Sequence, residues 1–361
     1  MKKIKFIFSF VLLLAVTISC TVEGISNDTA LIGTDSSANL NKIFDISTDN
    51  SGKVKITPTA DGASSFQVVF GQGTESPATV TPGASATHIY PEGKYTVKII
   101  ATSVSGAKTE QTFPLDVVYR APENLAISTS GEMKVKATAL YAKSFLVYYG
   151  DVANEVGKPM AIDQELPAHT YPATGGPFVL KVVAQSGGAA TSQATKTLYG
   201  FPIDFENAVV NYFFGTFGDV TFSKVENPNA SGLNTSATVG KYTKPTGAAS
   251  WSGTYSPLDI PVNFAYGSKI KVLAYNPDPA NIGKKLNVEL EWAVGGTPAN
   301  GVAALKAPFT TSGAWEEIVF DYGAISGIPV GAKFTQLVLR YNDSDSGIGE
   351  VIYVDNIRLT N

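Results

Sequence analysis

The sequence predicts an all-β protein built of β-sandwich domains in tandem, and three observations support this prediction. The chain of 361 residues has no stretch with a sustained helical period of apolar residues. Short segments of alternating apolar and polar residues follow one another, separated by Gly, Pro and Asn. Two series of such segments repeat with equivalent positions 79 to 83 residues apart. A chain of this length has room for several sandwich domains.

The N-terminus predicts export and a lipid anchor. Three early lysines precede an apolar run over residues 6–18, which is shorter than the roughly 20 residues of a membrane span and has the proportions of a signal peptide. The run ends in Thr17-Ile18-Ser19-Cys20, which resembles a bacterial lipobox, although Thr17 stands where an aliphatic residue is usual. The resemblance implies a lipoprotein signal peptide over residues 1–19 and lipidation of Cys20. An ordinary signal peptide cut nearby, with Cys20 incidental, is the alternative.

Composition excludes several classes of function. Removal of the three signal-peptide lysines changes the net charge from −4 to −7, which argues against a nucleic-acid partner. Cys20 is the only cysteine, so the chain forms no internal disulfide and no thiolate metal site. Residues 20–41 are polar with few aromatics, which predicts a flexible tether between the lipid and the first domain.

The two repeats predict a duplicated domain. Segments 53–56, 65–71, 88–91 and 94–101 are matched by segments 134–137, 144–150, 169–172 and 177–184. An interval of this size is a whole domain, so we expect sandwiches over residues 42–119 and 120–200.

Each repeat resembles a PKD domain, an immunoglobulin-like module of extracellular bacterial proteins. The resemblance rests on Phe-Gly-Gln-Gly-Thr at 70–74, a His-x-Tyr-Pro motif and the strand 95–101, and it is weaker in the second repeat. It implies Ig-like spacer domains. His88 and His169, the only histidines, occupy equivalent positions, so we expect them to be packed or hydrogen-bonded near the following tyrosine. Catalysis by a Ser-His-Asp or Cys-His set and zinc binding through histidine are therefore excluded.

Residues 201–361 form a third domain of different composition, which contains all three tryptophans. Its opening segment 203–206 and closing segment 351–359, with the aromatic strand 314–322 between them, resemble the galactose-binding-like jelly rolls used as carbohydrate-binding modules. The resemblance implies a β-jelly-roll sandwich whose terminal strands pair, often beside a structural calcium. Calcium prefers carboxylate and carbonyl oxygens. The side-chain ligands would be Asp204, Glu206 and Asp355; the alternative is that Glu206 and Asp355 cap strand ends and face water.

Exposed aromatic residues are the first requirement of a glycan site, because a sugar ring stacks its apolar face on an aromatic plane. Trp251 lies among small residues after a Gly/Pro-rich segment, which favours exposure. Residues 212–214 are three adjacent aromatics that cannot all face one core from a single strand. Trp292 follows the apolar register of its strand and lies either in the core or at the rim.

Polar partners for the sugar hydroxyls are the second requirement. If Val288 and Leu290 point inward, Glu289 and Glu291 lie on the outer face of the sheet. Arg340, within an apolar strand, is either a paired structural ion or a hydroxyl-binding group. The candidate carbohydrate-binding residues are Trp251, Trp292, Tyr212, Phe213, Glu289 and Arg340.

The domain order predicts the function class. A lipid-anchored chain with spacer sandwiches and a terminal module of this kind resembles the surface glycan-binding proteins of Bacteroidota. The resemblance implies a non-catalytic polysaccharide receptor at the outer-membrane surface, beside a porin-type glycan importer and its lipoprotein partner, with a β-glucan such as laminarin as ligand. Two alternatives stay open. One is an adhesin or structural protein, and the other is a glycosidase that uses only carboxylates such as Glu289 and Glu291.

Overall fold

The computed structural model describes residues 35–361 except 74, 131–132, 173–176, 208–210, 295–296 and 329–331, and it describes no side chains over 292–302. The predicted signal peptide, Cys20 and most of the tether lie outside the described residues. In the described part of the chain, no helix is long and apolar enough to cross a bilayer.

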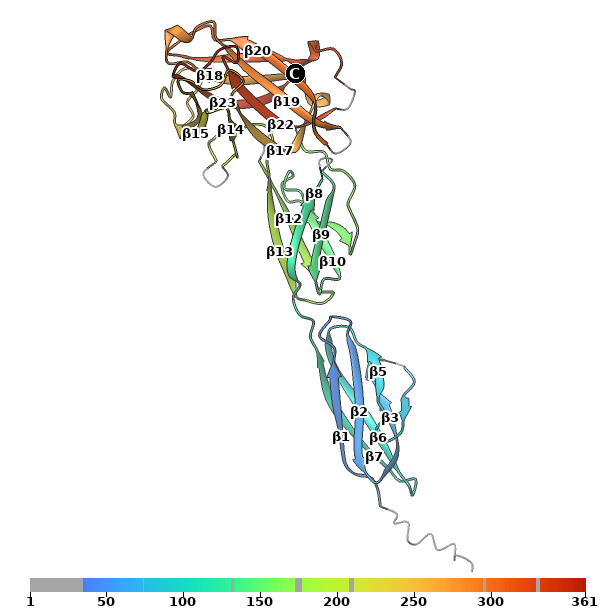
Figure 1. Ribbon diagram of the computed structural model, residues 1–361. Coiled ribbons are helices and arrows are strands. Elements are labelled where there is room, and N and C mark those ends of the chain that lie inside the picture. Colours follow the sequence, from blue (N-terminus) through green and yellow to red (C-terminus); the bar gives the residue numbers. More distant parts are fainter. Residues whose placement is uncertain are drawn as a thin grey trace, which may run out of the picture. The chain divides into compact units, whose positions relative to one another are not determined.

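The chain is all-β, as predicted, with antiparallel sheets throughout (Figure 1). It divides into two compact units, residues 1–119 and 120–361. The division coincides with the predicted end of the first sandwich. The second unit contains both the second repeat and the C-terminal domain.

The first repeat is a sandwich of a three-stranded and a four-stranded sheet. Its strands are β1 (Ala38–Ile46), β2 (Lys53–Asp61) and β5 (Ala86–Ile89) in one sheet, and β4 (Ala78–Val80), β3 (Ala63–Val69), β6 (Gly93–Ser103) and β7 (Lys108–Val117) in the other. Alternate residues such as Val54, Ile56 and Val68 are completely buried between the sheets. Strand β1 begins at Ala38, inside the segment predicted as tether, because its pairing with β2 already starts there.

The second repeat has the same arrangement of buried positions. One sheet is β8 (Glu123–Thr129) with β9 (Val135–Leu140), and the other is β11 (Lys158–Ala161), β10 (Ser144–Tyr148), β12 (Phe178–Gln185) and β13 (Thr191–Leu198). The core of the second repeat contains Val135, Phe145 and Val182. The equivalent core residues of the first repeat are Val54, Phe66 and Ile99.

The repeated histidines have a structural role. His88 stacks on Phe70 with ring centroids 4.3 Å apart, and His169 stacks on Tyr149 at 3.7 Å. The side-chain Nε2 of His169 lies 2.7 Å from a carboxylate oxygen of Asp151. Packing and hydrogen bonding therefore account for both histidines, as the sequence predicted.

The C-terminal domain is a jelly-roll sandwich of two five-stranded sheets (Figure 1). In order across the first sheet, the strands are β14 (Gly215–Phe217), β17 (Gly253–Asn263), β22 (Lys333–Tyr341), β19 (Lys285–Val294) and β20 (Thr297–Pro308). Across the second they are β15 (Thr221–Glu226), β16 (Thr238–Lys244), β23 (Glu350–Thr360), β18 (Lys269–Tyr275) and β21 (Trp315–Asp321). Three single-turn 3-10 helices lie in loops: η2 (Phe264–Tyr266), η3 (Pro279–Asn281) and η4 (Tyr322–Ala324).

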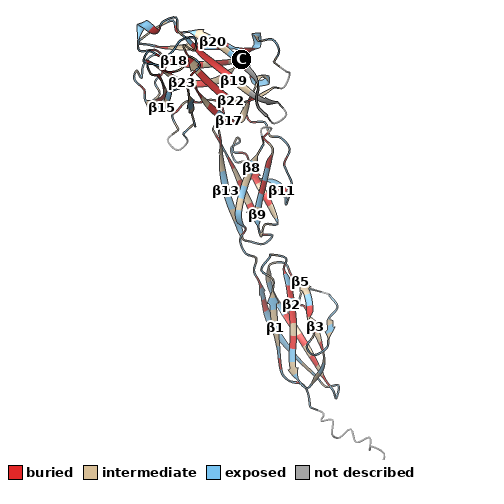
Figure 2. Ribbon diagram, viewed as in Figure 1, coloured by how far each residue is buried: buried red, intermediate tan, exposed pale blue. Residues whose placement is uncertain are grey.

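A single core lies between these two sheets, visible as buried segments along the strands in Figure 2. Val288, Leu290, Leu337 and Leu339 face it from the first sheet. The first and last segments of the domain meet through two backbone hydrogen bonds of 2.9 Å between Ile203 and Ile357, as the resemblance implied.

Candidate glycan-binding face

The outer face of the first sheet collects polar and aromatic side chains in register. Because side chains alternate along a strand, burial of Val288 and Leu290 places Glu289 and Glu291 on the opposite side, away from the core. The neighbouring strands add their own outward residues to the same rows. We call this surface the outer face, and it comprises Phe217 of β14, Gly253 and Tyr255 of β17, Gln336, Val338 and Arg340 of β22, Asn287, Glu289 and Glu291 of β19, and Ala304 and Lys306 of β20.

Two exposed aromatic rings lie at the β14–β17 end of the outer face. Trp251, in the loop before β17, is 59% exposed, and its ring is nearly parallel to that of Phe217, with centroids 6.1 Å apart. Phe213, before β14, is also 59% exposed and meets the Tyr255 ring edge-on at 5.9 Å. The rings provide apolar planes of the kind on which sugar rings stack.

Two glycines allow the aromatic rings to lie against the sheet. A Cβ atom at Gly253 would come within 2.6 Å of the Phe217 ring and 2.9 Å of Arg340 Cγ. A Cβ atom at Gly215 would come within 2.5 Å of the Tyr255 ring. All three distances are shorter than ordinary van der Waals contacts, so the Phe217 and Tyr255 rings can lie flat over the strands only if residues 253 and 215 are glycine.

Arg340 connects the aromatic end of the face to its acidic centre. Its Nε lies 3.0 Å from a carboxylate oxygen of Glu289, and its guanidinium donates to the backbone carbonyl of Trp251. The guanidinium carbon also lies 5.0 Å from the centroid of the Phe217 ring, within cation–π range. Arg340 is therefore a paired ion, the first of the two alternatives, and hydroxyl binding by this residue stays a prediction.

Asn287 and Asp343 extend the polar network toward β20. The side-chain amide of Asn287 donates to Glu289 at 2.7 Å and to Asp343 at 3.1 Å, and Asp343 forms a 2.7 Å ion pair with Lys306. Burial opposes ionisation of Asp343, but the hydrogen bonds from Lys306 and Asn287 outweigh it and hold its pKa below the usual range. Asn287 is 1% exposed and its Oδ1 has no hydrogen-bond partner in the structure, which leaves an acceptor under the face.

Four of the six predicted binding residues lie at this face: Trp251, Phe213, Glu289 and Arg340. Tyr212 does not, because its hydroxyl donates to the carbonyl of Pro202 at 2.8 Å and its ring packs beside Phe205. Burial raises the pKa of Tyr212, which is consistent with a structural ring. The backbone of Trp292 belongs to β19, but its side chain lies outside the described side chains.

Sequence reasoning did not select Asn287, Tyr255, Gln336, Asp343 or Lys306. Asn287 could have been found, since it precedes Glu289 by two residues and so shares its face. Asp343 lies in a turn that follows β22. Its contact with Lys306 depends on the order of strands in the sheet, which the sequence does not show.

The three acids predicted to ligate calcium lie near the Ile203–Ile357 pairing. Asp355 is completely buried and accepts 2.8 Å hydrogen bonds from the Asn234 side chain and the Asn356 backbone. Burial, with the nearby charge of Asp204, raises the pKa of Asp355 to about 6 despite these bonds. Glu206 instead accepts from the backbone and hydroxyl of Thr238 at 2.7 and 3.2 Å. Among the described residues, no group of three or more His, Cys, Asp or Glu is arranged to hold a metal.

No protein-family model matches the sequence, and no curated protein matches it. Solved structures do match, at low similarity. One described as the structural basis for promiscuous specificity of carbohydrate-binding modules of the β-sandwich superfamily is 13% identical, with 91% of this chain and 100% of that chain covered and a TM-score of 0.29. The family 11 module of Clostridium thermocellum, in complex with a β-1,3-1,4-mixed-linked tetrasaccharide, is 14% identical over 44% of this chain and 92% of that chain, with a TM-score of 0.31.

A xylanase 10B fragment from Clostridium thermocellum, containing CBM22-1 and GH10 modules with bound xylohexaose, is 16% identical with a TM-score of 0.32. The match covers 44% of this chain and only 28% of that chain. At these identities and TM-scores, the comparisons support no statement about family or ligand, and the geometry of the outer face remains the basis for function.

Proposed function

We propose that this protein binds polysaccharide at the outer face without cleaving it. The observation that supports the proposal is the juxtaposition of two exposed aromatic rings, Trp251 and Phe213, with a fixed row of guanidinium, carboxylate and amide groups. Stacking removes the apolar face of a sugar from water, while the polar row hydrogen-bonds hydroxyls at the ring edge. Because β-strands and side-chain contacts hold this row in place, binding requires little ordering of the protein.

The charges of the outer face favour an uncharged polysaccharide. Arg340 is paired with Glu289, and Lys306 is paired with Asp343. A uronate or sulfate group would have to displace these carboxylates, and it would also meet the further charge of Glu291. Neutral hydroxyls can hydrogen-bond to the same groups without disrupting the pairs. A neutral β-glucan such as laminarin is therefore the first ligand to test.

The two glutamates of β19 are better suited to binding than to hydrolysis. A glycosidase needs one carboxylic acid that gives up a proton and a second carboxylate that attacks or activates water. Glu289 is held by Arg340 and Asn287, and Glu291 accepts a hydrogen bond from Gln336. Both carboxylates serve as structural parts of the polar row, which supports a receptor in preference to an enzyme.

The cellular role in this proposal rests on the N-terminal sequence and the repeats. Lipidation at Cys20 would anchor the chain to the outer membrane, and the two Ig-like sandwiches would act as spacers. The C-terminal domain would then capture polysaccharide at the cell surface for a porin-type importer and its lipoprotein partner. An adhesin that binds protein is the alternative, because sandwich domains alone do not define a ligand.

We also propose a structural calcium at the Asp204–Asp355 pair. Asp355 is completely buried and the nearby charge of Asp204 helps to raise its pKa, and two such carboxylates are the hard oxygen ligands that suit calcium. Glu206 would join the ligand set only if its carboxylate left Thr238. Calcium there would join the first and last segments of the domain. Thermal unfolding with EDTA and with added CaCl₂ tests this, and identical melting curves would contradict it.

Calorimetric titration of the full chain tests the main proposal. The panel is laminarin, barley mixed-linkage β-glucan, soluble xylan and dextran, with polygalacturonate as the anionic control. Saturable binding of a neutral glycan, with no new reducing ends after prolonged incubation, is the expected result. Release of reducing ends would favour the hydrolase, and a flat response to every polysaccharide would favour the adhesin.

A further inference from the structure

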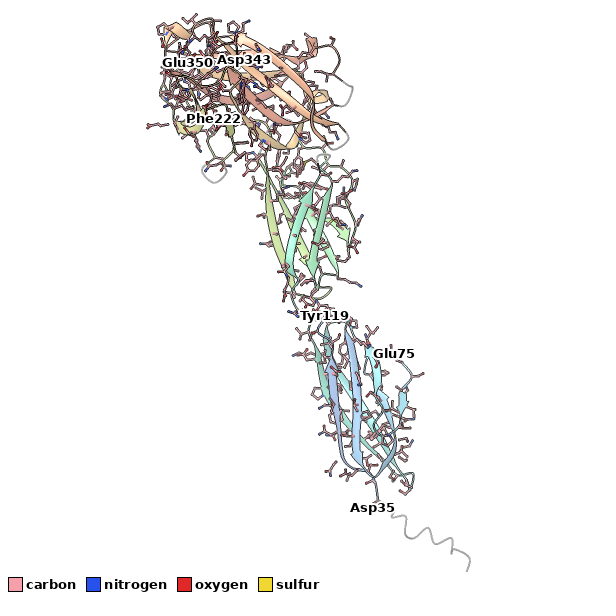
Figure 3. All side chains as sticks on the ribbon, in the orientation of Figure 1. Asp35, Glu75, Tyr119, Phe222, Asp343 and Glu350 are labelled. Carbon is pink, nitrogen blue, oxygen red and sulfur yellow. The ribbon has the colours of Figure 1, made fainter. Side chains whose placement is uncertain are left out.

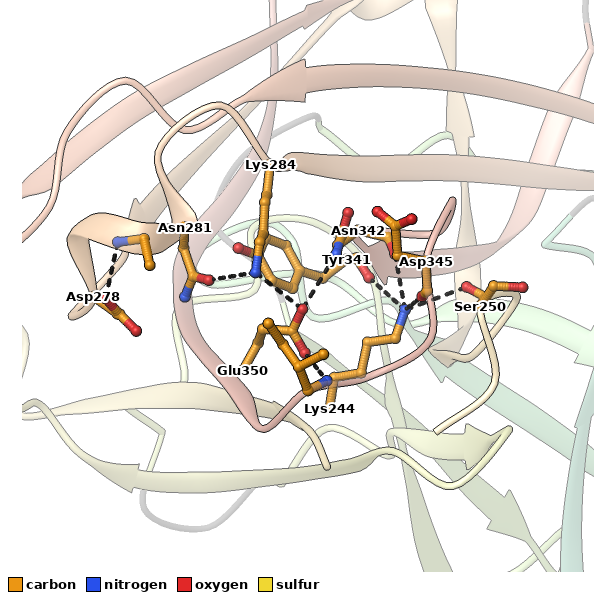
Figure 4. A network of polar contacts seen from close by, with 11 residues as sticks. Lys244, Ser250, Asp278, Asn281, Lys284, Tyr341, Asn342, Asp345 and Glu350 are labelled. Atoms are coloured by element: carbon orange, nitrogen blue, oxygen red, sulfur yellow. Dashed lines mark hydrogen bonds and ion pairs between the residues drawn. The ribbon is translucent and has the colours of Figure 1, made fainter. Parts of the chain in front are cut away.

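Lys244, the last residue of β16, is a buried cation beneath the loops that border the outer face. Its side chain is completely buried, and its Nζ donates only to backbone carbonyl oxygens in the structure (Figure 4). The acceptors are the carbonyls of Ser250, Tyr341, Asn342 and Asp345, at 3.4, 3.2, 2.8 and 2.8 Å. An ammonium has three N–H donors, so the four carbonyls offer an acceptor to every one of them.

The Tyr341 carbonyl ends strand β22, and the other three carbonyls belong to two loops that both contribute to the outer face. The first loop, residues 245–252, leads into β17 and contains Trp251. The second loop, residues 342–349, connects β22 to β23 and contains Asp343. Figure 3 labels Asp343 and Glu350, the first residue of β23. The Lys244 ammonium therefore lies between the backbone next to the exposed ring and the backbone next to the Asp343–Lys306 pair.

The two loops also pair directly. Gly247 donates its backbone N–H to the Gly347 carbonyl at 2.8 Å, and Gly347 donates to the Ala248 carbonyl at 2.9 Å. A Cβ atom at Gly347 would lie 2.1 Å from the carbonyl oxygen of Pro245, so the backbones approach as closely as glycine permits. Converging carbonyl dipoles repel one another, and a cation at their centre offsets that repulsion.

A second cation nearby has a different set of contacts. Lys284 donates to the side-chain oxygens of Asn281 at 2.9 Å and Glu350 at 3.1 Å (Figure 4). Glu350 is 4% exposed and also accepts from the Asn342 side chain at 3.2 Å. Lys284 thus stabilises the same region through side-chain oxygens, whereas Lys244 donates to backbone carbonyls.

We propose that Lys244 is a positioning residue for glycan binding, whose ammonium serves as a built-in cation that fixes the Trp251 loop and the Asp343 loop in the geometry of the outer face. The inference rests on the proposed function. The Trp251 carbonyl also accepts from Arg340, so the loop position determines both the exposed ring and the guanidinium beside it. Small displacements of such groups weaken binding strongly.

Lys244→Ala in the full chain, with laminarin as the probe, tests the assignment. The substitution removes three methylenes and the ammonium, which is the outline of propylammonium. We expect calorimetric affinity to fall about tenfold or more, because the loops lose hydrogen bonds to a charged group. Added propylammonium should restore most of it, whereas tetramethylammonium, which has no N–H donor, should not. Lys241→Ala, on the opposite face of the same strand β16, is the matched control and should change affinity less than about twofold.

The outcomes separate this inference from the proposed function. If the unmodified chain binds no polysaccharide of the panel, the proposed function fails and the inference fails with it. If the unmodified chain binds but Lys244→Ala binds equally well, the positioning role alone is overturned. Loss of affinity without selective rescue by propylammonium also overturns it. If neither Lys244→Ala nor Lys244→Met folds, as judged by circular dichroism, Lys244 supports the fold and the positioning assignment is overturned.

Discussion

Replacement of Trp251 by Ala should remove the larger of the two exposed aromatic rings of the outer face while leaving the fold intact. The residue is 59% exposed and contributes nothing to the buried core of the domain. A tryptophan offers roughly 150–250 Å² of surface, so about 130 Å² of Trp251 faces water and about half of that, one ring face, can be covered by a sugar. At about 25 cal/mol per Å² this corresponds to about 1.6 kcal/mol. The Kd for a bound glycan should therefore rise about 15-fold.

Calorimetry of Trp251→Ala with laminarin and barley β-glucan measures this change, with the melting temperature recorded in parallel. Tyr266→Ala is the matched control, because Tyr266 is a 42% exposed aromatic of the same domain that lies outside the outer face. It should bind like the unmodified chain. If Trp251→Ala retains full affinity for a glycan that the unmodified chain binds, the stacking argument is refuted.

Three further predictions follow from the same contacts. Arg340→Ala leaves Glu289, 8% exposed, without its counter-charge, and should cost about 2 kcal/mol in urea unfolding as well as weakening glycan binding. Gly253→Val places side-chain atoms where the Phe217 ring and Arg340 lie, so glycan affinity should fall sharply, and unchanged calorimetric affinity would contradict the packing argument. Burial opposes ionisation of Glu350, but hydrogen bonds from the Ile348 backbone, Lys284 and Asn342 outweigh it and hold its pKa below the usual 4.5. The ionised form therefore contributes stability above about pH 4.5 that is lost as the pH falls further, and Glu350→Gln should flatten this acid limb in urea unfolding at a series of pH values.

The strands and their faces could be predicted from the sequence because alternation is a local signal. Val288 and Leu290 are apolar and their neighbours are charged, which places Glu289 and Glu291 outward without knowledge of the rest of the sheet. The repeat interval similarly predicted two equivalent sandwiches, and stacked rings at His88 and His169 occupy equivalent places in both.

The contacts between the site residues could not be predicted from local signals. Arg340, Glu289 and Trp251 are adjacent only because β17, β22 and β19 are neighbours in the sheet, although they are not consecutive in sequence. Tyr212 shows the opposite case. Tyr212 directly precedes Phe213 in the same aromatic run. Its ring nevertheless packs beside Phe205, and its hydroxyl donates to a backbone carbonyl.

The same contacts that organise the outer face restrict what it can do. A face that uses its carboxylates to hold Arg340, Lys306 and Asn287 in place has well-ordered hydrogen-bonding groups, but those groups are already engaged with one another. The Asn287 Oδ1 atom is buried without a hydrogen-bond partner in the structure. Such an arrangement favours recognition of an uncharged chain of sugars through shape and hydroxyl contacts, with Trp251 and Phe213 supplying the apolar part of the binding free energy. It disfavours proton transfer, which requires a carboxyl group free to change its charge during the reaction.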